Sequence, residues 1–285
     1  MTGNAEWLEI DAGDGLCLHV VRSGSGAPLL LLHGFTGSVE TWAPLRAELS
    51  DRFTILAVDL PGHGSSGAPT DSARYALSRF ADDLVLLLDT LGIERAAVLG
   101  YSMGGRAALQ LTLRYPARVA ALVLESTSPG ISEPVERASR VAADSVLADT
   151  IESDGVAAFV DRWERLPLWD SQATLPEESR TRLRAQRSTN RALGLANSLR
   201  GAGTGSETSV IDRLSEVRVP TLLVTGGLDP KYVDLGRLMK VSVPRATMAV
   251  VSGAGHAVHL ERPAEFAALV KQFLDSAALE AGQWS

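Results

Sequence analysis

The sequence has almost no cysteine, no long apolar run and little lysine. Cysteine occurs once in 285 residues, at Cys17, so the chain can form neither an intramolecular disulfide nor a cysteine-based zinc site. No apolar run approaches the roughly 20 residues that a membrane-spanning helix needs. Lysine is also scarce: 24 of the 27 basic residues are arginine. An arginine at any one position is therefore weaker evidence of a function than usual.

The charge balance and the N-terminus exclude further classes. A formal net charge of −7 makes nucleic acids and anionic membranes poor partners. The first seven residues have neither a basic start nor an apolar stretch, so they do not resemble a signal peptide. The composition, 45% hydrophobic and 21% charged, is typical of a globular domain. We therefore expect a cytoplasmic protein that needs no metal; the sequence leaves its oligomeric state open.

Apolar runs of strand length alternate with amphipathic segments in the first 130 residues. The strand-like runs cover 15–21, 28–32, 54–58, 96–100 and 118–124, and apolar spacing predicts helices at 77–91 and from residue 102 onward. Nearly continuous apolar strands separated by helices indicate a mostly parallel sheet with helices on both faces.

The pattern changes after residue 130. Residues 131–204 contain no strand-like run and predict polar helices at about 135–149, 155–165, 176–187 and 191–199; strand-like runs return at 219–224 and 248–251, and a helix at 263–274 closes the chain. We therefore expect an α/β core formed by residues 1–130 and 205–285, interrupted by a helical lid at 131–204.

A nucleophile pattern lies where a predicted strand meets a predicted helix. Gly100-Tyr-Ser102-Met-Gly104 matches G-x-S-x-G, a turn that exposes the serine hydroxyl above a sheet, with glycines where backbones come too close for a Cβ. At a helix N-terminus, such a turn also offers free N–H groups to a developing negative charge. The pattern predicts Ser102 as the nucleophile.

The partners that a catalytic serine needs follow later strands. Asp229 follows the run at 219–224 and His256 follows the last predicted strand, and the order Ser, Asp, His is that of α/β-hydrolases. The predicted oxyanion donors are the N–H groups of Met103 and Phe35. Asp59 stands too early in the chain to be the acid, and Asp234 falls inside a predicted helix. The remaining histidines (His19, His33, His63 and His259) are expected to be structural or at the surface.

These residues resemble the α/β-hydrolase fold and, within it, the family of 2-succinyl-6-hydroxy-2,4-cyclohexadiene-1-carboxylate synthases of menaquinone biosynthesis. Lidded hydrolases in general share the core stretches 33–37, 59–64 and 255–256. The segment 100–106 and the lid stretches 159–168, 184–190 and 194–205 are more discriminating, because lids vary greatly between hydrolases. This chain departs from the family pattern at Pro230, which could tilt the loop that carries Asp229.

The resemblance implies a carbon–oxygen lyase that uses no cofactor. Its reaction would remove pyruvate from 2-succinyl-5-enolpyruvyl-6-hydroxy-3-cyclohexene-1-carboxylate, a substrate with three carboxylates. Matching the family pattern residue by residue makes Arg106, Arg140 and Arg187 carboxylate-binding residues, with Tyr101 and Trp163 lining the cavity.

Two other functions remain open from the sequence. The same triad would serve a hydrolase of esters, thioesters or carbon–carbon bonds, because a fold does not specify a reaction. A non-catalytic binding protein on this scaffold is the weaker alternative, since it would be expected to lack one of the three triad residues.

Overall fold

The computed structural model describes residues 5–281, which are built around an eight-stranded sheet. The strand order is β1-β2-β4-β3-β5-β6-β7-β8. β1 and β2 pair antiparallel, and β2 is antiparallel to β4, whereas the strands from β4 to β8 are all parallel. The expected α/β-hydrolase sheet is thereby confirmed. Its strands are β1 (Glu6–Asp11), β2 (Cys17–Ser23), β3 (Ala27–Leu32), β4 (Phe53–Val58), β5 (Ala96–Tyr101), β6 (Val119–Glu125), β7 (Thr221–Gly226) and β8 (Ala246–Val251).

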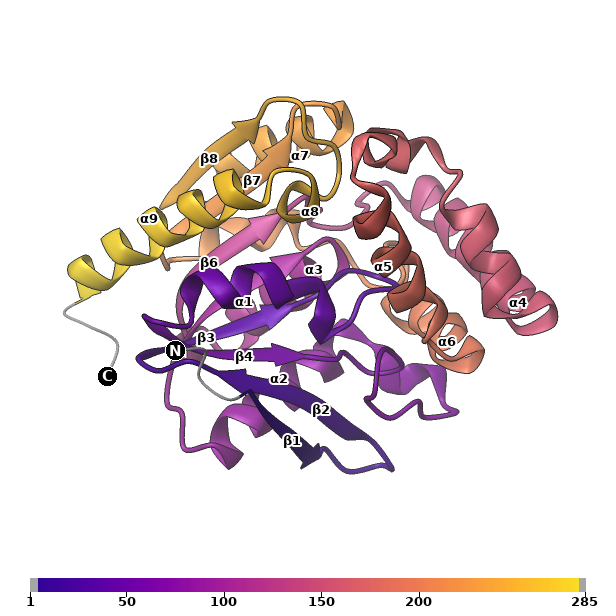
Figure 1. Cartoon of the computed structure of the whole chain (residues 1–285), viewed down its shortest axis with the longest axis horizontal. Coiled ribbons are helices and arrows are strands. Elements are labelled where there is room, and N and C mark those ends of the chain that lie inside the picture. The colour runs from indigo at the N-terminus through magenta and orange to yellow at the C-terminus, as the bar shows by residue number, and fades with distance from the viewer. Residues whose placement is uncertain (1–4, 282–285) are drawn as a thin grey trace.

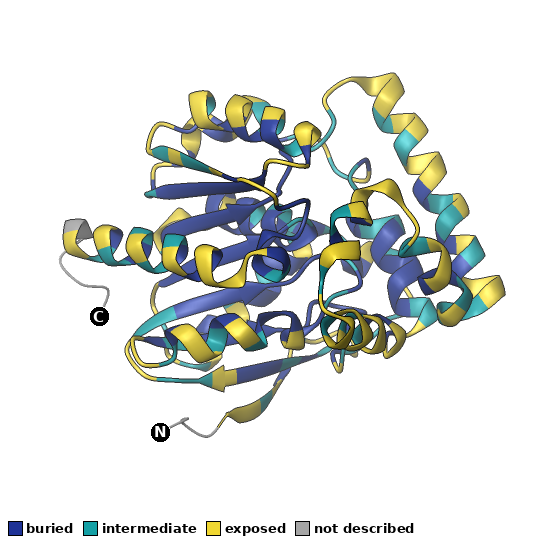
Figure 2. Cartoon of the chain, turned by 45° about the horizontal axis from the view of Figure 1, so that its top comes forward, coloured by how far each residue is buried: buried dark blue, intermediate teal, exposed yellow. Residues whose placement is uncertain are grey.

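Helices cover both faces of the sheet because the central strands bury side chains on both sides. In β3, Leu30 and Leu32 pack into one apolar cluster, with α2 (Leu77–Thr90), α3 (Met103–Arg114) and α7 (Pro230–Ser242). Leu29 and Leu31 pack into the other, with α1 (Ala43–Leu49), α8 (Val258–Glu261) and α9 (Pro263–Ala281). Each buried leucine contributes roughly 1.5–3 kcal/mol. Figure 2 shows the central strands almost entirely buried between exposed helix surfaces.

The segment between β6 and β7, expected to form the lid, is helical and has a small core of its own. It contains α4 (Pro134–Trp163), α5 (Glu177–Ser188) and α6 (Ala192–Ala202). α4 combines the two helices expected at 135–149 and 155–165, and Gly155 interrupts it with a φ of 81° that suits glycine. α4 and α6 share the buried side chains of Ile151, Phe159 and Leu195.

The lid sits at one end of the sheet, away from the end of α9 (Figure 1). α6 approaches the core so closely that a Cβ on Gly194 would overlap the backbone of Gly62. Short 3₁₀ helices complete the connections, and no helix within residues 5–281 is long and apolar enough to cross a membrane. The 3₁₀ helices are η1 (Val39–Trp42), η2 (Ser72–Tyr75), η3 (Pro116–Arg118), η4 (Pro167–Thr174) and η5 (Ile211–Glu216).

Candidate active site

The turn between β5 and α3 holds Ser102 in a strained conformation. Its φ of 52° lies in a region that residues with a Cβ rarely adopt. The neighbouring glycines allow this because a Cβ on Gly104 would overlap the carbonyl oxygens of Leu32 and His33. The Ser102 N–H donates to the Glu125 carbonyl at 2.9 Å, which ties the turn to β6. The backbone thus presents the Ser102 hydroxyl at the carboxyl edge of the sheet.

The three predicted catalytic side chains lie within hydrogen-bond distance of one another. Ser102 Oγ is 3.1 Å from His256 Nε2, and His256 Nδ1 is 2.8 Å from Asp229 Oδ2. His256 and Asp229 are buried, with 2% and 7% of their surface exposed. Pro230 does not disturb this arrangement, because it occupies the first turn of α7, where a missing N–H costs nothing. The arrangement can make the serine oxygen basic.

The two predicted oxyanion donors, the N–H groups of Met103 and Phe35, belong to residues that line the same cavity as Ser102. Met103 begins α3, and Phe35 follows Gly34, where an added Cβ would lie 3.4 Å from Ser102 Cβ. Within residues 5–281, neither the Phe35 nor the Met103 N–H donates to another protein group. Unpartnered donors beside a nucleophile can stabilise an oxyanion.

A cavity of about 210 Å³ opens in front of Ser102 between the core and the lid. Four of the five predicted substrate-binding residues line it: Tyr101, Arg106, Arg140 and Trp163. Arg106 donates to the carbonyls of Gly203 (3.0 Å) and Ala202 (2.5 Å), and burial lowers its pKa to about 10, so the guanidinium stays charged at neutral pH. Arg140 pairs with Asp144 at 2.8 Å.

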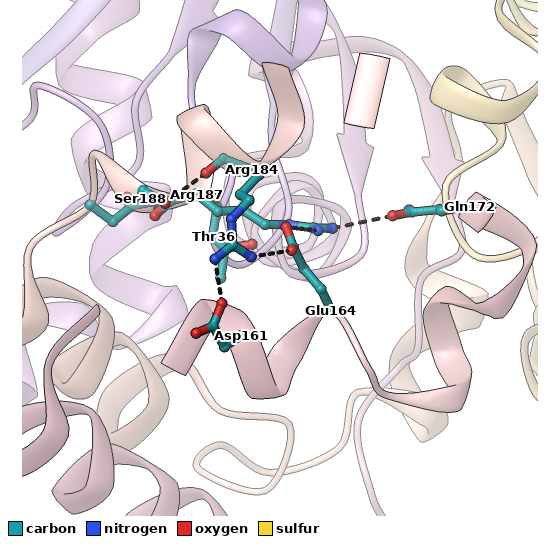
Figure 3. A network of polar contacts seen from close by, with 8 residues as sticks. Thr36, Asp161, Glu164, Gln172, Arg184, Arg187 and Ser188 are labelled. Carbon is teal, nitrogen blue, oxygen red and sulfur yellow. Dashed lines mark hydrogen bonds and ion pairs between the residues drawn. The ribbon is translucent and has the colours of Figure 1, made fainter. Parts of the chain in front are cut away.

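Arg187, the fifth, does not line this cavity. Its guanidinium donates to Glu164 Oε1 at 3.0 Å and to Gln172 Oε1 at 3.4 Å, and its Cζ lies 5.2 Å from the centre of the Trp169 ring. Figure 3 shows Arg187 and Arg184 converging on Glu164. The sequence did not determine the direction of this side chain, and in the structure a carboxylate of the lid pairs with it.

Three further residues line the cavity without a predicted role: Trp169, Lys231 and Tyr232. The Tyr232 ring lies 4.5 Å from the His256 ring and the Trp169 ring 5.6 Å from it, both edge to face. Burial raises the pKa of Tyr232 and raises that of Tyr101 well above its usual value, so both phenols keep their protons. Lys231 adds a third cation to the cavity. Lys231 and Tyr232 could have been found, since they follow Asp229 in the first turn of a helix.

The histidines expected to be structural are bound within the protein. Leu60 N–H donates to His33 Nε2 at 3.0 Å, and burial lowers the pKa of His33 to about 3 and that of His63 to about 4. His259 pairs with the buried Glu125 at 2.9 Å. Asp59 accepts from the Val39 and Ser65 N–H groups, and Asp234 lies in α7, paired with Arg237.

Comparison with known proteins agrees with this geometry. The alpha/beta hydrolase fold family matches residues 27–263. A Bacillus subtilis protein provisionally named a 2-succinyl-6-hydroxy-2,4-cyclohexadiene-1-carboxylate synthase is 41% identical over 94% of this chain and 98% of its own. The Pectobacterium atrosepticum protein of that name is 31% identical, over 86% and 93%.

A solved structure shows the same likeness in three dimensions. The structure of MenH from S. aureus superimposes with a TM-score of 0.87 at 32% identity, covering 91% of this chain and 98% of that one. The chain belongs to the α/β-hydrolase fold family and, within it, to the family of enzymes named 2-succinyl-6-hydroxy-2,4-cyclohexadiene-1-carboxylate synthases.

Proposed function

We propose that this chain eliminates pyruvate from 2-succinyl-5-enolpyruvyl-6-hydroxy-3-cyclohexene-1-carboxylate, forming 2-succinyl-6-hydroxy-2,4-cyclohexadiene-1-carboxylate in menaquinone biosynthesis. One observation carries the proposal: Ser102 faces a cavity that Arg106, Arg140 and Lys231 line. Among the described residues, Asp144 is the only carboxylate in that lining, and it is already paired with Arg140. A cationic cavity suits a substrate with three carboxylates, because guanidinium groups bind carboxylates through parallel hydrogen bonds. The relatives' names support the same reaction.

The triad supplies the base for this reaction. His256 takes the hydroxyl proton of Ser102, and the serine oxygen takes the ring proton α to the succinyl ketone. The electron pair of that C–H bond moves onto the ketone oxygen, which the Phe35 and Met103 N–H groups would stabilise as an enolate. When the ketone re-forms, the ring gains its second double bond and the C–O bond to the enolpyruvyl group breaks. The released enolpyruvate takes up a proton to become pyruvate.

Hydrolysis is the alternative that the same residues allow. In a hydrolase, Ser102 would attack a carbonyl carbon, and the same two N–H groups would hold the tetrahedral oxyanion. The reactions differ in what they leave on the enzyme, since hydrolysis passes through an acyl-serine and elimination does not. The three cations favour the elimination, because a simple ester offers them no carboxylate.

The proposal is tested by incubating the purified protein with the freshly made precursor. We expect equal amounts of pyruvate and of the conjugated diene, followed by ultraviolet absorbance, at a rate far above the uncatalysed background. Ser102→Ala should reduce both to near background. No diene above background, together with an acyl-Ser102 trapped from a p-nitrophenyl ester, would favour the hydrolase instead.

A further inference from the structure

The turn that carries the Phe35 N–H is backbone-strained. This oxyanion turn, residues 34–38, is closed by the Gly37 N–H, which donates to the Gly34 carbonyl at 3.0 Å. Thr36 has a φ of 69°, in the left-handed region, although it carries a branched side chain. Such a conformation costs on the order of 1–3 kcal/mol and persists only where the surroundings hold it. Something other than local preference must therefore fix Thr36.

A buried asparagine from the lid contacts this turn directly. Asn190 lies just after α5 and is 6% exposed. Its Nδ2 donates to the Thr36 carbonyl at 2.9 Å and to the Arg187 carbonyl at 3.1 Å, while its Oδ1 accepts from the Gly64 N–H at 3.2 Å. One side chain thus joins the oxyanion turn, the loop after β4 and the end of a lid helix.

The other end of the turn also rests against the lid. The side-chain amide of Gln186, one turn before Asn190, lies 3.0 Å from Ser38 Oγ and 2.6 Å from Thr41 Oγ1. The turn is therefore held at Thr36 by Asn190, just after α5, and at Ser38 by Gln186 of α5. The Thr36 carbonyl and the Gly37 N–H belong to one planar peptide group, and the Gly34 carbonyl that this N–H contacts shares its peptide group with the Phe35 N–H. With the Gly37–Gly34 bond closed as well, the direction of the Phe35 N–H has little freedom left.

We infer that Asn190 is a positioning residue of the oxyanion site, through which the docked lid sets the direction of the Phe35 N–H. The inference rests on the proposed use of that N–H as an oxyanion donor. It makes the lid part of the catalytic machinery as well as a wall of the binding cavity. Asn190 itself is absent from the residues that line the cavity, so its loss should alter turnover rather than substrate binding.

The lid offers a matched control in Asn197. This side chain is 3% exposed, and its Nδ2 donates to the carbonyls of Pro69 and Thr70, at 3.1 and 3.0 Å. It resembles Asn190 in burial and in donating to two carbonyls, but it docks the lid onto a loop far along the chain from Phe35. Asn190→Asp and Asn197→Asp each place a carboxylate against two carbonyl oxygens. Only the first change disturbs the oxyanion turn.

The experiment compares both variants with the wild-type enzyme in two assays. The first is the rate at which a fluorophosphonate ester labels Ser102: the serine oxygen bonds to phosphorus, fluoride leaves, and the phosphoryl oxygen enters the oxyanion site. The second is steady-state release of pyruvate. For Asn190→Asp we expect labelling and kcat to fall about tenfold or more, a part of the roughly 100–1,000-fold that loss of one donor costs. KM should stay within about twofold. Asn197→Asp should match the wild type in both assays, even if its melting temperature falls as much as that of Asn190→Asp.

Other outcomes separate this inference from the proposed function. Equal losses in the two variants, in proportion to their stability, would overturn the positioning role, as would a change in KM alone. A wild-type Ser102 that the probe does not label would contradict the oxyanion assignment and the inference together. If the wild type releases no pyruvate but Asn190→Asp still slows labelling, the proposed substrate is wrong and the role of Asn190 stands.

Discussion

The three lid and pocket arginines should respond differently to the same substitution. Arg106 and Arg140 line the cavity, whereas Arg187 is buried against Glu164. Replacing each with Met removes the charge and keeps much of the side-chain bulk. The structure therefore predicts that Arg106→Met and Arg140→Met weaken substrate binding and that Arg187→Met weakens the fold.

The magnitudes follow from what each guanidinium contacts. A hydrogen bond to a charged group contributes roughly 1.5–3 kcal/mol, so Arg106→Met should raise KM about 10-fold to 100-fold. Arg140 should give only a few-fold rise, because its side chain is 40% exposed and shared with Asp144. Arg187→Met should lower the free energy of unfolding by about 1–3 kcal/mol. This is less than breaking an isolated buried ion pair costs, because Glu164 still pairs with Arg184 at 2.7 Å.

The assay is pyruvate release coupled to lactate dehydrogenase, with thermal unfolding measured on the same samples. Arg79→Met serves as the control: it removes one positive charge from a surface pair with Asp14, 50% and 65% exposed, and should change neither quantity. For Arg187→Met we expect a melting temperature lower by several degrees, at about 2–4 °C per kcal/mol, and an unchanged KM. A KM that rises with Arg187→Met but not with Arg106→Met would refute this account of the cavity.

Three further changes test the triad, the turn that carries Ser102 and the buried histidines. Asp229→Asn should lower kcat roughly 1,000-fold to 10,000-fold by losing the carboxylate that orients His256, and a loss below about tenfold would contradict the triad. Gly104→Ala should leave little folded protein, because the added Cβ would overlap the Leu32 carbonyl, and a fully active variant would show that the Ser102 turn tolerates a side chain. His63 is held neutral, with its pKa lowered from 6.5 to about 4, so the unfolded state binds the extra proton between those values. Stability should therefore fall as pH drops from about 6.5 to 4, by up to about 3 kcal/mol from this residue. His63→Asn should make urea unfolding less sensitive to pH in that window, and an identical pH dependence would contradict the assignment.

Much of the fold could be predicted because burial dictates the pattern. The central strands are apolar at nearly every position, as in β3 and β6, and such runs are readily recognised as buried strands. β1 was missed because it is an edge strand with mostly exposed residues, whose sequence carries little signal. The glycine at 155 was consistent with a boundary between two helices. That the two helices join into α4 with a kink at Gly155 could not be predicted from the sequence.

The candidate site also has residues that the sequence predicts and residues that it does not. Ser102, Asp229 and His256 follow strands, and the sheet fixes where strand ends meet, so order along the chain sufficed. The direction of the Arg187 side chain could not be predicted from the sequence, because it depends on Glu164, which lies 23 residues earlier and pairs with it in the folded lid. No local pattern identified Trp169, which reaches His256 from a 3₁₀ helix. Side-chain direction within the lid is a tertiary property.

The most direct test of the chemistry is a deuterium isotope effect on pyruvate release. The precursor would carry deuterium at the ring carbon α to the succinyl ketone, and wild-type enzyme would be compared with Ser102→Ala. We predict that deuterium slows the wild-type enzyme in a single turnover and that Ser102→Ala releases pyruvate only at the background rate. Equal single-turnover rates for both isotopes, with activity retained in Ser102→Ala, would contradict proton abstraction by the serine oxygen.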